Sequence, residues 1–267
     1  MTTRTEPPAA AARAAAIAWH RGHHDAICDS IVPWAHGRVV RASEFPTYWD
    51  YNLLYAAGPL DGIDATELAR VADERLGDLA HRHVQVEDER AGERLRAGFQ
   101  ALGYRATPLL YMRHEGDLPP VRDDVRLREA PDAESEPLRR RWFVEDPWQD
   151  AAVLDAFIRD EGRVFAQLGG HVLLAEDPGS AAPVAYVRIR VAGAVGEVAE
   201  AYAAPEFRNR GIGGALVAAG VRSMAAAGAR HVFIVADGAG RSQGLYGRLG
   251  FRTVWVLHQF VRRPGTI

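Results

Sequence analysis

Hydrophobic and polar positions in the second half of the chain predict a group of neighbouring strands. His171 to Ala175 is a short apolar run, and Val184 to Val191 alternates between apolar and polar side chains. The turn residues Asp177 to Ser180 lie between them and predict a hairpin with a long loop. Helical signals over Arg139 to Gly162 precede these strands, and Glu197 to Ala204 continues the sheet. Antiparallel strands followed by a strand–helix–strand crossover predict a mixed α+β layer.

The landmarks of this pattern occur twice. A predicted helix ends at His81 before a strand-like run, and another ends at Gly228 before a similar run. In both places a further apolar-periodic helix and a last strand follow. The helix ends are Leu102 to Arg105 and Leu249 to Arg252, and the last strands are Pro108 to Arg113 and Val254 to Val261. Short units share such signatures by chance in some proteins, but several landmarks in one order at nearly equal spacing favour an ancient duplication.

The clearest boundary in the sequence lies near Glu115 to Asp124. There Gly116, Pro119 and Pro120 stand among charged residues without periodicity, which is typical of a linker. A chain of 267 residues is long enough for about two domains. We therefore expect one domain over residues 1–118 and a second over residues 125–267.

Composition narrows the classes of partner. Hydrophobic residues make up 48% of the chain and charged residues 25%, the balance of a globular protein. A net charge of −3 gives no basic footprint for nucleic acid. The single Cys28 favours a reducing compartment, and no apolar run reaches the length of a membrane span. We expect a cytoplasmic monomer or homodimer with neither nucleic acid nor a membrane as partner.

A glycine-containing loop after the strand that ends near Ala204 carries the candidate chemistry. It reads Arg208-Asn209-Arg210-Gly211-Ile212-Gly213-Gly214 and leads directly into a helix. Glycines let a backbone approach a ligand, and the unsatisfied amides and dipole of a helix N-terminus attract anions. With its two arginines, the loop predicts a pyrophosphate site. Leu216 stands where the dinucleotide fingerprint needs its third glycine, and no Gly-Lys-Ser/Thr follows, so neither of those sites fits.

The loop alone is a weak signal, and its neighbours make it specific. Arg-x-x-Gly-x-Gly after a strand, with Leu245-Tyr246-Gly247-Arg248-Leu249-Gly250-Phe251 downstream, resembles the GNAT superfamily of N-acyltransferases. The resemblance covers Val125 to Arg263. The first half resembles a truncated copy, so the whole chain resembles tandem GNAT proteins. The resemblance implies an α+β (mixed α/β) fold of two GNAT-like domains. Each would be a mixed, largely antiparallel twisted sheet flanked by helices, with the N-terminal domain truncated.

The resemblance also implies roles for residues at matching positions. Acetyl-CoA would be the acyl donor, and the loop Arg208 to Gly214 would bind its pyrophosphate. The main chain of Tyr202 and Ala203 would hold the pantetheine arm or the thioester carbonyl. Tyr246 matches the acid that protonates the departing thiolate, because a phenol with a pKa near 10 keeps its proton at neutral pH. A tyrosine packed beside Phe251 is the alternative interpretation.

A general base is the remaining chemical requirement. An alkyl amine with a pKa of about 10.4 is almost entirely protonated at pH 7, and only the neutral amine attacks. Glu200, on the strand beside the expected thioester, is the first candidate for base or water-positioning group, and Glu197 is the second. The alternative for both is an exposed polar position on a half-buried strand. The acceptor stays unnamed, since function belongs to a site rather than to a fold.

The first half lacks the features that identify the second. After its predicted strand 52–57 the loop has no arginine, and Asp61 and Asp64 would repel a pyrophosphate. Phe99 stands at the position that corresponds to Tyr246. We therefore expect a single acyl-CoA site, in the second half.

Two further features bear on the site. At a position where the superfamily commonly has an asparagine that contacts the cofactor, this chain has Ala239. His20, His23 and His24 lie on an alanine-rich amphipathic helix without a second ligand group at recognisable spacing, so we expect no metal site.

The sequence predicts an acetyl-CoA-dependent N-acetyltransferase that acts on a primary amine of a small molecule or peptide by direct attack. A non-catalytic acyl-CoA-binding regulatory protein is the alternative, which Ala239 favours slightly. A tandem enzyme with two working sites is a third hypothesis, and the loop of the first half argues against it.

Overall fold

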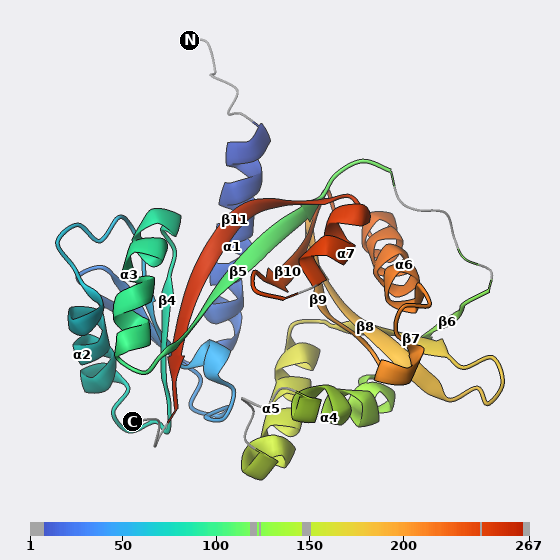
Figure 1. Ribbon diagram of the computed structural model, residues 1–267, viewed down its shortest axis with the longest axis horizontal. Coiled ribbons are helices and arrows are strands. Elements are labelled where there is room, and N and C mark those ends of the chain that lie inside the picture. The colour runs from blue at the N-terminus through green and yellow to red at the C-terminus, as the bar shows by residue number, and fades with distance from the viewer. Residues whose placement is uncertain (1–7, 118–121, 123, 146–150, 241, 264–267) are drawn as a thin grey trace. The chain divides into compact units, whose positions relative to one another are not determined.

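The computed structural model describes residues 8–117, 122, 124–145, 151–240 and 242–263 (Figure 1). The helices are α1 (Pro8–Ile27), α2 (Ala65–Arg75), α3 (Glu89–Ala101), α4 (Glu136–Glu145), α5 (Leu154–Gln167), α6 (Ile212–Ala226) and α7 (Ser242–Arg248). The strands are β1 (Ser30–Trp34), β2 (Gly37–Arg41), β3 (Leu53–Ala56), β4 (Arg82–Val86), β5 (Arg105–His114), β6 (Arg126–Ala130), β7 (His171–Glu176), β8 (Pro183–Ala192), β9 (Val195–Ala203), β10 (His231–Asp237) and β11 (Phe251–Arg262). None of the helices in these parts of the chain combines the length and the apolar character of a membrane span.

The chain forms two compact units and passes between them more than once. The first unit holds residues 1–111, 236–243 and 253–267, and the second holds residues 112–235 and 244–252. β11 therefore lies almost entirely in the first unit, although it is the last strand of the chain.

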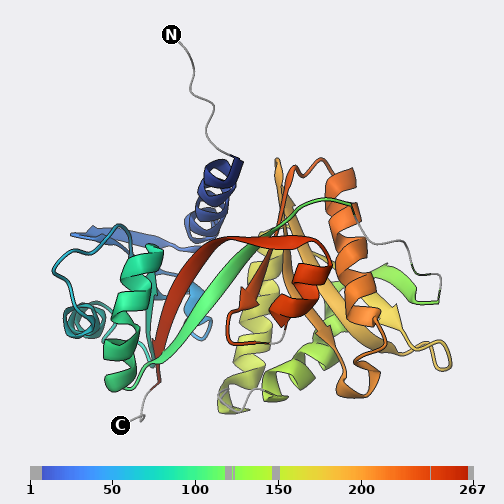
Figure 2. The same cartoon turned by 45° about the horizontal axis from the view of Figure 1, so that its top comes forward.

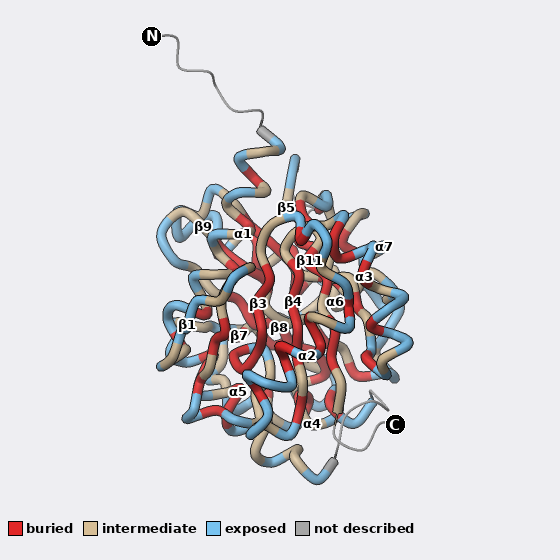
Figure 3. Tube along the Cα trace, turned by 90° about the vertical axis from the view of Figure 1, so that its left-hand side faces the viewer, coloured by how far each residue is buried: buried red, intermediate tan, exposed pale blue. Residues whose placement is uncertain are grey.

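The first unit is a mixed sheet with two helices packed on one face. β1, β2 and β3 pair antiparallel in that order, β3 lies parallel to β4, and β4 pairs antiparallel with β11. Val84 stands opposite Leu54 on one side and Phe260 on the other, so these side chains share a face, where they pack with α2 and α3. β3 and β4 are buried along nearly their whole length (Figure 3).

Buried polar side chains join α1 to the other face of this sheet. His20 hydrogen-bonds through Nδ1 to Tyr111 Oη at 2.7 Å and through Nε2 to Gln85 Oε1 at 2.8 Å. Since an amide oxygen only accepts, Nε2 carries the proton and Nδ1 accepts from the tyrosine. Both ring nitrogens are thus engaged by protein groups. Among the described residues, no three His, Cys, Asp or Glu side chains are arranged to hold a metal ion.

The second unit is an antiparallel sheet extended by one parallel strand. β6, β7, β8 and β9 pair antiparallel in that order, and β10 runs parallel to β9. Successive residues of β8 face opposite sides: Tyr186 packs with Leu138 of α4 and Phe165 of α5, whereas a Cβ atom on Gly220 of α6 would lie 2.9 Å from Ile189. α4 and α5 therefore cover one face and α6 the other (Figures 1 and 2).

The predicted fold class is confirmed, because both units are mixed, mainly antiparallel sheets with helices on their faces. The same succession occurs twice, as β3–α2–β4–α3–β5 and as β9–α6–β10–α7–β11. The hairpin β1–β2 and strand β6 are elements that the sequence patterns do not single out. β6 carries charged residues at three of its five positions, which obscures its alternation.

The two compact units and the predicted domains divide the chain differently. Residues 253–267 group with the first unit, where β11 pairs with β4 from His258 opposite Val86 to Arg262 opposite Arg82. The units describe how the chain packs. The contiguous domains 1–118 and 125–267 stay a prediction about its duplicated halves.

Candidate active site

The predicted loop enters α6 with two residues in the left-handed region. Asn209 has a φ of 61° and Gly211 a φ of 78°, and Gly211 is the N-cap of α6. No side chain caps this helix, and its first backbone bond runs from the Ala215 amide to the Gly211 carbonyl at 3.0 Å. The preceding amides have no acceptor in the described part of the chain; they belong to Ile212, Gly213 and Gly214. These donors and the helix dipole form a site for an anionic group.

The two arginines of the loop make different contacts. Arg208 donates from Nε to the Ala203 carbonyl at 2.8 Å and from Nη2 to Glu145 Oε2 at 2.5 Å, so its guanidinium is held at the end of α4. Arg210 lies over the Phe207 ring, 5.1 Å from its centroid. No side-chain hydrogen bond of Arg210 is formed with any described residue. In this conformation Arg210, rather than Arg208, is open to a bound anion.

Arg122 adds a contact that no sequence motif indicates. It donates from Nη1 to the Arg210 carbonyl at 2.9 Å, and its Nε donates to Asp124 Oδ1 at 2.9 Å. A Cβ atom on Gly211 would lie 1.8 Å from Arg122 Nη1, so a larger residue there would displace the guanidinium, and the φ of 78° also favours glycine. Arg122 therefore holds the peptide that leads into α6.

β9 leaves part of one backbone edge without a strand partner. Its pairing with β10 covers residues 195–198 and extends no further within the described residues, whereas its pairing with β8 continues to Ala203. The Ala204 amide donates to the Val184 carbonyl of β8 at 3.0 Å. By the alternation of an antiparallel ladder, the main chain of Tyr202 then faces β8 and that of Ala203 faces the uncovered edge. Of the two residues, Ala203 has its amide on the open edge, while its carbonyl already accepts from Arg208 Nε at 2.8 Å.

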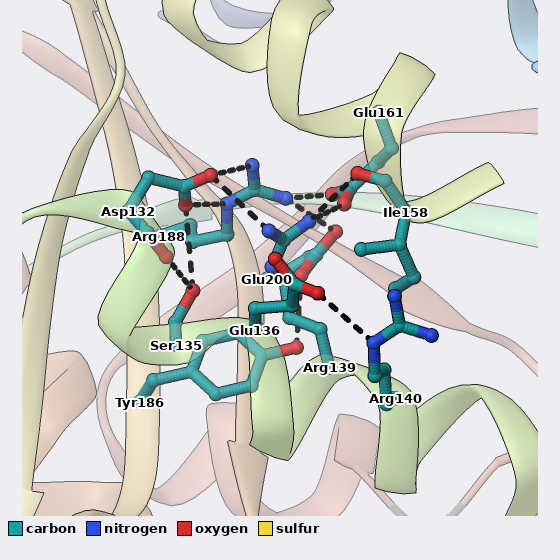
Figure 4. A network of polar contacts seen from close by, with 10 residues as sticks. All are labelled: Asp132, Ser135, Glu136, Arg139, Arg140, Ile158, Glu161, Tyr186, Arg188 and Glu200. Carbon is teal, nitrogen blue, oxygen red and sulfur yellow. Dashed lines mark hydrogen bonds and ion pairs between the residues drawn. The ribbon is translucent and has the colours of Figure 1, made fainter. Parts of the chain in front are cut away.

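Glu200 lies on β9, on the face covered by α4 and α5 (Figure 4). Tyr186 donates from Oη to Glu200 Oε2 at 2.9 Å, and Arg188 donates from Nη1 to Oε1 at 3.2 Å. Burial, together with the charge of Glu200, raises the pKa of Tyr186, so this hydroxyl remains a donor at neutral pH. The Glu200 side chain keeps 21% of its surface exposed. It is a fixed carboxylate that a ligand can still reach.

Arg188 connects Glu200 with a buried group of charges (Figure 4). Its side chain is 1% exposed and forms ion pairs with Glu161 and with Asp132. Arg139 of α4 pairs with the same two carboxylates. Removing one partner of a buried ion pair costs about 3–5 kcal/mol, because the other charge is left uncompensated. The members come from five separate segments, which is why their spacing in the sequence gives no sign of the network.

Glu197, the second candidate base, is enclosed. It is 4% exposed, and its Oε2 accepts from Arg190 Nη2 at 2.5 Å. A register shift in the β8–β9 pairing places both Glu197 and Glu200 opposite arginines of β8, although an odd sequence separation normally points side chains to opposite faces. Since Glu197 is buried and paired, Glu200 is the more accessible of the two carboxylates.

Tyr246 is a buried residue of α7, 7% exposed, with its ring centroid 6.2 Å from that of Phe251. Its hydroxyl has no hydrogen-bond partner among the residues that the structure describes. Burial raises the pKa of Tyr246 to about 12, so the phenol stays protonated at neutral pH. α7 lies close to the start of α6, because a Cβ atom on Gly214 would be 3.9 Å from Leu245 and 3.8 Å from Leu249. The structure thus brings the helix of Tyr246 to the loop.

The corresponding helix start in the first unit is closed by its own side chain. Asp64 is the N-cap of α2, and its Oδ1 accepts from the Glu67 amide at 2.8 Å. A carboxylate therefore occupies the place where α6 offers unbound amides. Phe99 is fully buried and stacks on Phe260 with ring centroids 4.1 Å apart. The anion site and the phenol of the second unit have no counterparts at these positions.

Residues 128–251 match the acetyltransferase (GNAT) family. The match includes Glu200, the loop and Tyr246, and it begins after Arg122. No protein with a curated description matches the sequence.

Solved structures below 25% identity share the fold with this chain. A functionally unknown conserved protein from Staphylococcus epidermidis aligns with a TM-score of 0.70 at 17% identity, over 88% of this chain and 94% of that chain. A GCN5-related N-acetyltransferase from Kribbella flavida aligns with a TM-score of 0.58 at 19% identity, over 95% of this chain and 96% of that chain. A tandem GNAT protein from the clavulanic acid biosynthesis pathway aligns with a TM-score of 0.51 at 16% identity, over 74% of this chain and 67% of that chain.

Proposed function

Because residues 128–251 form a GNAT-family acetyltransferase domain, we propose that the protein is an acetyl-CoA-dependent N-acetyltransferase. Its acceptor is a primary amine of a small molecule or peptide, which attacks the thioester directly. The observation that carries the proposal is the uncapped start of α6, where neighbouring amides without acceptors lie next to an exposed arginine.

The start of α6 suits a pyrophosphate. The amides from Ile212 to Gly214 donate to its oxygens, and Arg210 adds charge that no protein carboxylate neutralises within the described residues. Arg122 fixes the peptide in front of these amides through the Arg210 carbonyl. The Ala203 amide, on the uncovered edge of β9, donates to the arm that links the pyrophosphate to the thioester, while the Ala203 carbonyl accepts from Arg208.

Two side chains move protons in this proposal. Acetyl-CoA, when bound, supplies the activated acetyl group. Glu200 accepts the proton that the amine must lose, directly or through a water molecule, and Tyr186 and Arg188 keep its carboxylate in one orientation. Tyr246 holds its proton at neutral pH and has no protein acceptor among the described residues, so it donates toward the departing sulfur.

The test measures two quantities on the full chain. Isothermal calorimetry measures acetyl-CoA binding, and a thiol reagent follows free CoA in the presence of a panel of primary amines. We expect binding and amine-stimulated release. Binding without release for any amine class would sink the enzyme hypothesis in favour of an acyl-CoA-binding protein. Absence of binding would mean that the loop is misassigned.

A further inference from the structure

α4 carries an exposed tryptophan on the side that faces the sheet. Trp142 follows Leu138 by four residues and precedes Glu145 by three, so all three lie on one stripe of the helix. Leu138 packs with Tyr186 and Tyr202, and Glu145 accepts from Tyr202 Oη at 2.5 Å, so this stripe faces the sheet. Trp142 nevertheless keeps 38% of its surface exposed. The indole is therefore accessible to a ligand, although the stripe that carries it faces the sheet.

The neighbours of Trp142 on α4 lead to the proposed acyl-transfer site. Glu145 binds Arg208 at the start of the loop, at 2.5 Å. Arg139, three residues before Trp142, belongs to the buried network that holds Glu200 (Figure 4). Along α4, Trp142 therefore lies between Glu145, which binds the loop residue Arg208, and Arg139, which belongs to the network around Glu200.

The exposed Trp142 and the partly exposed Glu200 have complementary chemistry. The Glu200 carboxylate is 21% exposed and attracts an ammonium group. The indole of Trp142 offers apolar area and a π face, on which an aromatic partner gains binding energy beyond the burial of its surface. Val144, two residues further on, is 57% exposed but lies on the opposite side of α4, away from the stripe.

We propose that Trp142 is the acceptor-recognition surface of the site, and that the acceptor is a primary amine bearing an aromatic or bulky apolar group. This inference rests on the proposed N-acetyltransferase function. The apolar group packs on the indole while Glu200 binds the nitrogen. In the transfer the N–C bond forms as the C–S bond breaks, the amine loses a proton to Glu200, and the sulfur receives one from Tyr246.

The test compares two amines that differ in the group that would meet the indole. 2-Phenylethylamine carries a phenyl ring, and 1,4-diaminobutane carries a second charge instead. For each, kcat/KM is measured with saturating acetyl-CoA in the wild type and in Trp142→Ala, Trp142→Phe and Val144→Ala. We expect the wild type to prefer 2-phenylethylamine. Trp142→Ala should lower kcat/KM for that amine by roughly 10-fold or more, mainly through KM, since loss of one apolar contact is worth about 10–200-fold.

The same substitution should leave kcat/KM for 1,4-diaminobutane within about 2-fold. Trp142→Phe should retain most of the preference, because a phenyl ring keeps the aromatic face, and Val144→Ala should behave as the wild type. The binding of acetyl-CoA should be unchanged in every variant.

Transfer without preference for the aromatic amine, or an equal loss for both amines in Trp142→Ala, would overturn the inference and leave the enzyme hypothesis intact. If the wild type releases no thiol with any amine, both fail together. Since Trp142 is exposed, we expect Trp142→Ala to fold. Trp142→Phe gives an independent comparison. If Trp142→Phe and Val144→Ala lost the preference for 2-phenylethylamine equally, the inference would also be overturned.

Discussion

Two tyrosines of the second unit keep their protons for the same reason but offer them differently. Burial raises the pKa of Tyr246 to about 12 and also raises that of Tyr186. The Tyr186 hydroxyl is committed to Glu200, whereas that of Tyr246 has no acceptor among the described residues. The Tyr186 hydroxyl therefore holds the Glu200 carboxylate in position. The Tyr246 hydroxyl, buried beside the start of α6, is available to donate to a ligand.

Tyr246→Phe tests this difference. The phenyl ring retains the packing against Phe251 but removes the donor, so kcat should fall by about 10²-fold while the affinity for acetyl-CoA stays the same. Thiol release and calorimetry measure the two quantities. Tyr104→Phe is the matched control, because it removes a buried phenol hydroxyl of the first unit. An unchanged kcat in Tyr246→Phe would remove this residue from the mechanism.

At the scale of elements, α2 and α6 begin in opposite ways. The Asp64 carboxylate caps α2, whereas Gly211 leaves the amides of α6 uncapped. An N-terminal carboxylate stabilises a helix by about 0.3–1 kcal/mol, so the missing cap makes α6 less stable than it could be. The same absence makes its amides available to an anionic ligand. The start of α2 therefore favours the stability of that helix, whereas the start of α6 favours the binding of an anion.

Gly213→Asp places a carboxylate in the first turn of α6, two residues after the N-cap Gly211. A Cβ atom at Gly213 meets no heavy atom within 4 Å, so the variant should fold with an unchanged or higher Tm. The new carboxylate lies at the anion site and should abolish acetyl-CoA binding. Calorimetry and thermal unfolding measure the two effects. As a control, Gly179→Asp makes the same change in the turn between β7 and β8 and should leave acetyl-CoA binding unaffected. If Gly213→Asp still bound acetyl-CoA, the cofactor site would have to lie elsewhere.

At the scale of the whole molecule, the first unit buries several neutral histidines. Burial lowers the pKa of His24 far below its usual value, and lowers the pKa of His81 and of His83 to about 4. His81 and His83 also hydrogen-bond to main-chain oxygens of Asn52 and Trp49, at 2.9 and 3.1 Å. In the unfolded chain these rings take up protons near pH 6.5. Their stabilising contribution is therefore present above pH 6.5 and is lost as the pH falls toward 4.

The free energy of unfolding of the first unit should accordingly decrease as the pH falls from 6.5 to 4, by up to about 3 kcal/mol per histidine, and the urea midpoint should fall with it. Tryptophan fluorescence reports mainly this unit, which contains Trp19, Trp34, Trp49 and Trp255. His83→Gln removes one titrating ring and should flatten the pH dependence. His171→Gln, at a side chain that is 60% exposed, should not. A midpoint that is constant over this pH range would contradict the burial of uncharged rings.

The last strand of the chain gives a second prediction at this scale. A chain that ends at Arg252 loses the β11 residues that pair with β4, and Phe99 loses its stacking partner Phe260. The first unit should then unfold, while the second keeps all its residues. Hydrogen exchange of the truncated chain measures each unit separately. Full protection of β4 in that chain would show that β11 is dispensable.

Features that depend on residues close together in the chain could be predicted from the amino-acid sequence. Alternation and turn residues predicted the hairpin β7–β8, and one short run of glycines and arginines predicted the loop before α6. Tertiary structure decided what depends on distant residues: the pairing of β11 with β4, the contact of Arg122 with the Arg210 carbonyl, and the ion pairs that hold Glu200. Local patterns fix backbone conformation. Which charged group meets which partner follows only from packing, because burial removes the water that would otherwise compete for each of them.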